Sequence, residues 1–174
     1  PMTFELCIGT PSQCLRVGYD TGSYTTWVLD EDLFFQYPFY TSQSNTYQKT
    51  ENKLFIGETE YSVEGEEFTD VVKIFSNSEK TFHFNMILAT DYKDKVISAD
   101  GNAGFARIYE EDPSKDIFSK EMSRFSFLEH LFNTNLINRK ISWRVEFRNR
   151  NNIHNIPLYL TIILARNALN INTF

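Results

Sequence analysis

The sequence predicts a mostly β fold, formed as a single domain with one or two short helices. Strand-like segments dominate the 174 residues, whereas strong helical signals are confined to residues 127–133. Just ahead of them, Ser126 and Glu129 form a capping-box pattern. A chain of this length suffices for one domain of ordinary size and is too short for two large ones. Its 41% hydrophobic and 16% aromatic residues indicate a packed core.

The stretch most informative about chemistry is residues 15–28. Alternating apolar residues over 15–19 predict a strand that ends at an acid, and the turn that follows consists of Asp20, Thr21, Gly22 and Ser23. Gly22 permits a positive φ, and the hydroxyl groups of its neighbours lie beside the carboxylate. β-forming residues then resume up to Val28. A carboxylate held rigidly at the tip of a strand-turn-strand, with donors around it, can transfer protons in a reaction.

Together with its flanks, this stretch resembles the opening of the pepsin-like aspartic proteases. The family's order recurs here as a first strand, an I-G-T-P-x-Q turn at 8–13, a second strand, D-T-G-S at 20–23 and W-V at 27–28. The resemblance implies a single pepsin-like double-psi β-barrel lobe with Asp20 as a catalytic acid. It also implies a loop that supports this acid and a residue that lines the substrate cleft, which here are Thr21, Gly22, Ser23 and Trp27.

The resemblance continues beyond the active-site strand, with two departures. Matching segments are a surface turn at 39–47, the end of the flap hairpin at 65–72 and a D-G-x-x-G segment at 100–104. The position of the family's flap tyrosine is taken by Glu58. Tyr61 belongs to the substrate cleft only if the hairpin tip is shorter here, and is otherwise a surface or cross-strand tyrosine. At 102–103, Asn and Ala replace a branched apolar pair, which predicts looser support for Asp20.

Domain organisation follows from where the resemblance fades, which is after Arg148. We expect a pepsin-like N-terminal lobe over residues 1–150, and over 151–174 a divergent C-terminal strand or the start of a missing second lobe. The chain contains no second Asp-Thr-Gly or Asp-Ser-Gly triplet. Because aspartic proteases need two carboxylates, the other acid must come from a second lobe, from a second copy across a two-fold axis, or from nowhere.

The function implied by the resemblance is that of an aspartic endopeptidase, which hydrolyses peptide bonds of a peptide or protein substrate through an Asp-activated water. The resemblance implies no metal, no organic cofactor, and a secreted protein or a lysosomal or vacuolar one. Two alternatives stay open: a non-catalytic pepsin-like binding protein, and a truncated relative whose last residues replace the second lobe. The loop at 20–23 favours the protease, whereas the unusual flap and Asn102 favour the binding protein.

The two cysteines, Cys7 and Cys14, flank the predicted turn at 9–12. If Ile8 lies opposite Gln13, the cysteines lie directly across from each other on strands that are about 4.8 Å apart. A cross-strand disulfide is then geometrically possible, and two reduced thiols are the alternative. A metal site is not expected, because no further Cys or His lies near them in the sequence.

Charge and hydropathy exclude two classes of partner. The net charge is −6 and no basic patch offsets the acidic residues, which argues against nucleic-acid binding. The longest apolar run, at 156–165, has ten residues, whereas a membrane-spanning helix needs roughly 20. We therefore expect no membrane partner.

Overall fold

The computed structural model describes residues 3–33, 37–57, 62–74, 76, 78–93, 99–106, 121–134, 143–147 and 160–164. The strands are β1 (Thr3–Ile8), β2 (Gln13–Asp20), β3 (Trp27–Leu29), β4 (Gln48–Gly57), β5 (Ser62–Ile74), β6 (Phe82–Lys93), β7 (Gly101–Gly104), β8 (Trp143–Phe147) and β9 (Leu160–Leu164). The helical elements are short and include the 3-10 turns η1 (Glu31–Leu33) and η2 (Thr41–Gln43) and the helix α2 (Phe127–Asn133). The predicted mostly β fold is confirmed.

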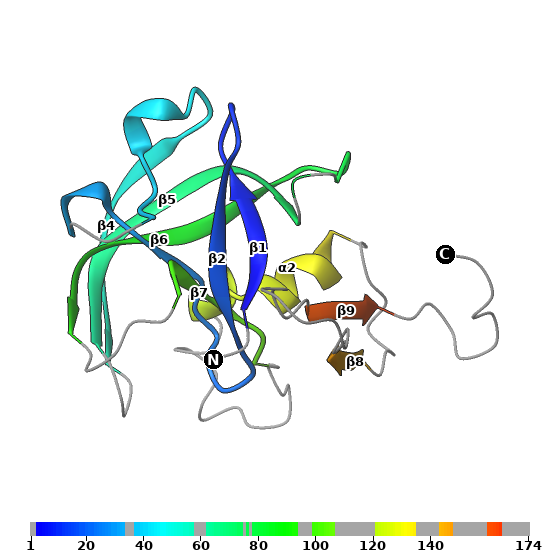
Figure 1. Cartoon of the computed structure of the whole chain (residues 1–174). Coiled ribbons are helices and arrows are strands. Elements are labelled where there is room, and N and C mark those ends of the chain that lie inside the picture. Colours follow the sequence, from blue (N-terminus) through cyan, green and yellow to red (C-terminus); the bar gives the residue numbers. More distant parts are fainter. Residues whose placement is uncertain are drawn as a thin grey trace, which may run out of the picture.

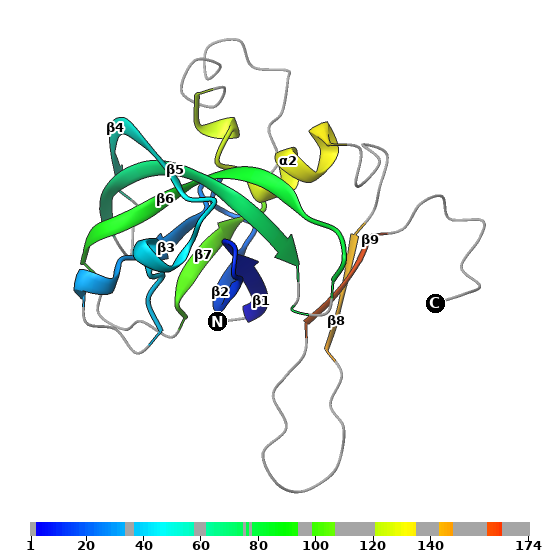
Figure 2. The same ribbon diagram turned by 90° about the horizontal axis from the view of Figure 1, so that it is seen from above.

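Seven of these strands form one sheet in the order β1-β2-β7-β3-β6-β5-β4 (Figure 1). Strand β1 also pairs with β5, where Leu6 lies opposite Ile74. The sheet therefore closes on itself, and β4 continues it beyond β5. The long strands β5 and β6 curve round the molecule in Figures 1 and 2. Closure leaves few free strand edges and encloses a core.

Strand β7 lies between β2 and β3, and it positions the end of β2. It runs parallel to β2, so that Asp20 pairs with Gly104, and antiparallel to β3, where Asn102 pairs with Trp27. The strand that enters the D-T-G-S turn and the strand that leaves it are thus both bonded to the same short element. Residues about 80 positions apart in the sequence meet here, because a parallel pair needs a long crossover connection.

The β1–β2 hairpin has the register predicted from the sequence. Ile8 pairs with Gln13 and Cys7 pairs with Cys14, and the two sulfur atoms form a disulfide with an S–S distance of 2.03 Å. The turn begins at Gly9, whose φ of 89° is strained for any residue with a side chain. A β-carbon at this position would also meet Ser44 Oγ at 2.7 Å. Glycine is therefore required at this turn.

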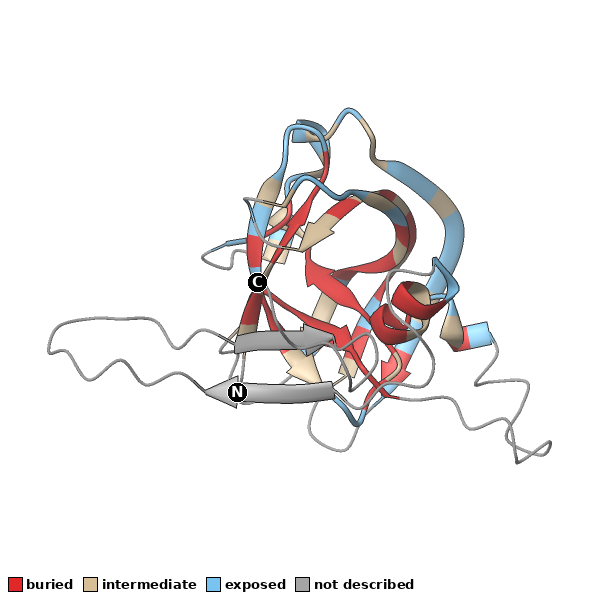
Figure 3. Cartoon of the chain, turned by 90° about the vertical axis from the view of Figure 1, so that its right-hand side faces the viewer, coloured by how far each residue is buried: buried red, intermediate tan, exposed pale blue. Residues whose placement is uncertain are grey.

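The core is aromatic, and helix α2 completes it. Ser126 accepts a hydrogen bond from the backbone N–H of Glu129 at 3.3 Å, so the predicted N-cap is confirmed. Phe127, the first residue of the helix, is fully buried and contacts the rings of Phe4, Phe84 and Phe105 at centroid distances of 5.5 to 5.9 Å. Figure 3 shows buried residues along the strands of the barrel and along α2. Aromatic edge and tilted contacts of this kind stabilise a core beyond simple area burial.

His130 also lies on α2, against strand β6. Its ring is 5.0 Å from that of Phe82 and 4.9 Å from that of Phe84. Burial lowers the pKa of this histidine, because the charged form would lose hydration without gaining a carboxylate partner. His130 therefore contributes to packing as a neutral ring.

Strands β8 and β9 form a separate two-stranded antiparallel sheet, in which Trp143 pairs with Leu164. Figures 1 and 2 place this pair to one side of the barrel. The pair spans residue 150, the boundary expected from the sequence, and the division into 1–150 and 151–174 stays a prediction. Within the described residues, no helix combines the length and hydropathy that crossing a membrane requires.

Candidate active site

Asp20 is the last residue of β2 and is only partly buried, so its carboxylate is accessible at the end of the strand. Its Oδ1 atom accepts a hydrogen bond from the backbone N–H of Gly22 at 2.8 Å. A backbone donor aimed at a carboxylate fixes the orientation of the side chain. The turn predicted from D-T-G-S therefore presents an oriented acid.

The backbone of the turn is held by the segment that follows β7. The N–H of Phe105 donates to the carbonyl of Asp20 at 2.7 Å, and the N–H of Ala106 donates to the carbonyl of Ser23 at 3.0 Å. These two bonds bracket the turn at its first and last residues. They fix the position of the carboxylate independently of the side chains around it.

Gly104 allows this close approach of the two backbones. A β-carbon there would lie 2.5 Å from the carbonyl carbon of Tyr24 and 2.6 Å from the backbone nitrogen of Thr25. Its own N–H donates to the hydroxyl of Thr26 at 3.1 Å. The glycine is needed because its neighbours are backbone atoms, which cannot rotate away.

The hydroxyl groups beyond the turn support the loop. Ser23 is 2% exposed, and its Oγ lies 2.9 Å from the hydroxyl of Thr25 and accepts the Thr25 N–H at 3.1 Å. Thr21, by contrast, is exposed. The Ser23 hydroxyl is therefore directed toward Thr25, and the supporting role expected of Ser23 stays a prediction. Sequence reasoning did not anticipate the part played by Thr25 and Thr26.

Asn102 ties strand β7 to the same loop. It is 9% exposed, and its side-chain N–H donates to the carbonyl of Thr25 at 3.3 Å. Ala103 next to it is fully buried. The looser support expected from these two residues is offset by a hydrogen bond that a branched aliphatic side chain could not make. In the sequence, an asparagine at a buried strand position was the signal that could have predicted this hydrogen bond.

Trp27 and Tyr61 are the two residues expected to line the substrate cleft. Trp27 is 4% exposed and packs against Tyr92 at a ring distance of 5.1 Å, so it belongs to the core beneath the loop. Its contact with a substrate stays a prediction. Tyr61 and Glu58 lie outside the described residues.

Burial shifts the pKa values of two further ionisable groups near the loop. Burial raises the pKa of the Tyr19 hydroxyl to about 12, and the ring packs on Phe105 at 4.4 Å. Burial also raises the pKa of Asp100, and the N–H of Arg16, which donates to its Oδ2 at 2.8 Å, only partly offsets this. The main cause of both pKa shifts is burial.

One group of potential metal ligands occurs in the described residues, at Glu5, Cys7 and Cys14. The two sulfur atoms are joined in the disulfide, so they are not available as thiolate ligands. The closeness of these three side chains is therefore explained by the β1–β2 hairpin, which the disulfide crosslinks.

A closed β lobe with a D-T-G-S acid at the tip of a braced strand pair is the kind of domain that aspartic proteases use. The family model "Eukaryotic aspartyl protease" matches residues 3–142, and the chain belongs to this family. A search of curated proteins found no match to the chain.

Proposed function

We propose that this chain supplies one catalytic carboxylate, Asp20, to an aspartic endopeptidase. The observation that carries the proposal is the geometry of this acid, which is accessible at the end of β2 and accepts the Gly22 N–H at 2.8 Å. Membership of the eukaryotic aspartyl protease family supports the same reaction class. The substrate is a peptide or an unfolded protein segment.

The reaction needs a second carboxylate beside Asp20. As is known for the aspartic protease dyad, two carboxyl groups that share a site cannot both ionise, so one keeps a proton. The ionised group takes a proton from a water molecule, which attacks the peptide carbonyl carbon, and the protonated group stabilises the oxygen that gains negative charge. Asp20 can fill either role.

The second acid comes from a second lobe or from a second copy of this chain. In a self-paired enzyme, a closed two-fold interface would use the same surface on both copies and bring two Asp20 side chains together. The two sources differ in concentration dependence. A dimer loses activity more steeply than linearly on dilution, whereas a chain that lacks its second lobe stays inactive at every concentration.

The experiment is an assay of unfolded-protein cleavage across concentration, between acid and neutral pH. We expect activity only from a dimer or after a second lobe is supplied, and we expect Asp20→Asn to abolish it, because Asn keeps the shape and removes the ionisable group. Asp91→Asn, at an exposed ion pair with Lys93 on β6, is the matched control and should leave activity unchanged. Cleavage that scales linearly with concentration and survives Asp20→Asn would refute the assignment.

A non-catalytic binding protein is the second candidate. It is favoured by the flap segment, where Glu58 takes the position of the family's tyrosine. This candidate predicts no cleavage at any concentration, even with a second lobe present. For either candidate we propose a secreted or lysosomal or vacuolar location, because the Cys7–Cys14 disulfide suits an oxidising compartment.

A further inference from the structure

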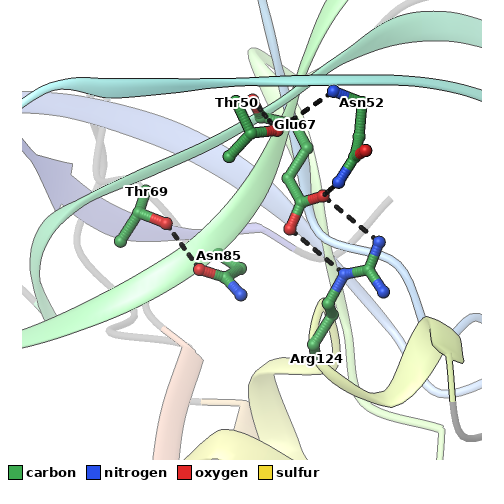
Figure 4. Close-up of polar contacts among 6 residues, drawn as sticks. All are labelled: Thr50, Asn52, Glu67, Thr69, Asn85 and Arg124. Carbon is green, nitrogen blue, oxygen red and sulfur yellow. Dashed lines mark hydrogen bonds and ion pairs between the residues drawn. The ribbon is translucent and has the colours of Figure 1, made fainter.

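An ion pair between the buried Glu67 and the exposed Arg124 connects β5 to the segment that precedes α2. The Nε of Arg124 donates to Glu67 Oε1 at 3.1 Å, and its Nη2 donates to Oε2 at 3.2 Å (Figure 4). Oε2 also accepts a hydrogen bond from the side chain of Asn52 at 2.7 Å. Glu67 is 5% exposed, so its charge is removed from water and is compensated by these three donors.

Glu67 lies directly opposite Ile87 in the β5–β6 register, and Ile87 is a fully buried member of the core cluster that contains Trp27. The neighbouring Glu66 is less buried and forms an ion pair with Lys49, the ordinary arrangement for a surface strand. A buried carboxylate without partners is strongly destabilising, and an apolar side chain at the same position would carry no such risk. A glutamate that faces inward therefore depends on Arg124, which makes the two segments interdependent.

The segment that carries Arg124 is in turn bonded to the catalytic loop. The guanidinium group lies 4.7 Å from the ring centre of Phe125. The carbonyl of Phe125 accepts the N–H of Thr26 at 3.0 Å, and its ring is fully buried in one cluster with Trp27. Thr26 is also the residue whose hydroxyl accepts the Gly104 N–H. A single backbone hydrogen bond, from Thr26 to Phe125, thus links the Arg124 segment to the residues that brace Asp20.

The same glutamate also holds the irregular part of β4. The pairing of β4 with β5 shifts register between Lys49 and Lys53. Within this interval the hydroxyl of Thr50 donates to the carbonyl of Glu67 at 3.1 Å, and Asn52 bonds to the Glu67 carboxylate (Figure 4). The backbone carbonyl and the side chain of Glu67 are therefore both hydrogen-bonded to residues of β4.

We propose that the Glu67–Arg124 pair is a positioning device that couples the β4–β5 hairpin to the loop bearing Asp20. The coupling runs from Glu67 through Arg124 and the Phe125 carbonyl to Thr26. Its importance for catalysis rests on the proposed role of Asp20. The alternative is a pair that only stabilises the barrel as a whole, with no selective effect on the loop.

Amide hydrogen exchange of the full chain, followed residue by residue by NMR, separates these two roles. Local opening of one segment accelerates only its own amides, whereas loss of global stability accelerates all strongly protected amides by a common factor. The Thr26 amide reports on the coupling, and amides of the β1–β2 pair, in the other core cluster, report on the whole barrel.

We expect Arg124→Met to accelerate exchange of the Thr26 amide roughly tenfold or more beyond the β1–β2 amides, because two charge-assisted bonds are lost. Lys49→Met is the matched control, since it breaks the neighbouring exposed ion pair to Glu66, and it should change neither set selectively. The reversed pair, Glu67→Arg with Arg124→Glu, should restore most of the protection of Thr26.

Two results would overturn the proposal: equal acceleration of all protected amides in Arg124→Met, or no acceleration at Thr26. If Arg124→Met does not fold, Glu67→Gln decides by the same comparison, because it keeps the size of the side chain and removes its charge. The readout does not require activity. A selective effect in a chain that shows no protease activity even with a second lobe would therefore refute the proposed function and leave the coupling intact.

Discussion

Substitution of Gly104 by alanine tests whether the approach of β7 to the loop that bears Asp20 is as close as the structure shows. The new methyl group would lie 2.5 Å from the carbonyl carbon of Tyr24, and ordinary contact begins near 3.4 Å, so the backbones must separate by about 0.9 Å. Both neighbours are backbone atoms, and the Gly104 N–H is bonded to Thr26, so no side chain can absorb the shift. Overpacking of this kind costs about 1–3 kcal/mol. For a chain of this size, the melting temperature falls by roughly 2–4 °C per kcal/mol.

The assay is urea unfolding of wild type and Gly104→Ala, with Gly57→Ala as the control. The nearest atoms to a β-carbon at Gly57 belong to the exposed side chain of Phe55, which can turn away. Gly57→Ala should therefore change the free energy of unfolding by less than about 1 kcal/mol. In an enzyme assembled with its second acid, Gly104→Ala should also lower kcat by up to about a hundredfold, since a 1 Å displacement of a reacting group has that effect. A Gly104→Ala protein as stable as wild type would refute the reasoning.

Two further predictions concern pH. Burial between Phe82 and Phe84 lowers the pKa of His130, so the unfolded chain binds more protons, and stability should fall as the pH drops below the unfolded value near 6.5. His130→Phe should flatten this dependence in urea titrations from pH 7.5 to 5, and an unchanged slope would contradict it. For Asp100 the sign is opposite: burial raises its pKa, so it destabilises the fold when ionised, and this cost disappears as the pH falls through the folded pKa. Asp100→Asn keeps an oxygen acceptor for the Arg16 N–H, and should be more stable than wild type at pH 7 with the difference shrinking toward pH 4; a constant difference would count against it.

Features that depend on neighbours in the sequence could be predicted from the sequence. The register of the β1–β2 hairpin follows from a short turn, so the spacing of Cys7 and Cys14 is enough to place them opposite each other. The helix cap at Ser126 depends on residues three positions apart. The turn that contains Asp20 is equally local, because the bond from Gly22 to its carboxylate spans two residues. Local sterics and hydrogen bonding determine such features without help from distant segments.

Only the tertiary structure decided what lies beneath the turn. Glu67 and Arg124 are 57 residues apart, and the bond from Asn102 to Thr25 joins residues 77 apart. A glutamate beside another glutamate on a strand gives no sign of which one faces inward, because a bulge or a register shift changes the face. Closure of the barrel sets that choice by placing β3, β5, β6 and the segment before α2 around one core. The amino-acid sequence alone thus determined the family, the mostly β class and the candidate acid, while the groups that hold this acid in place depend on contacts between distant segments.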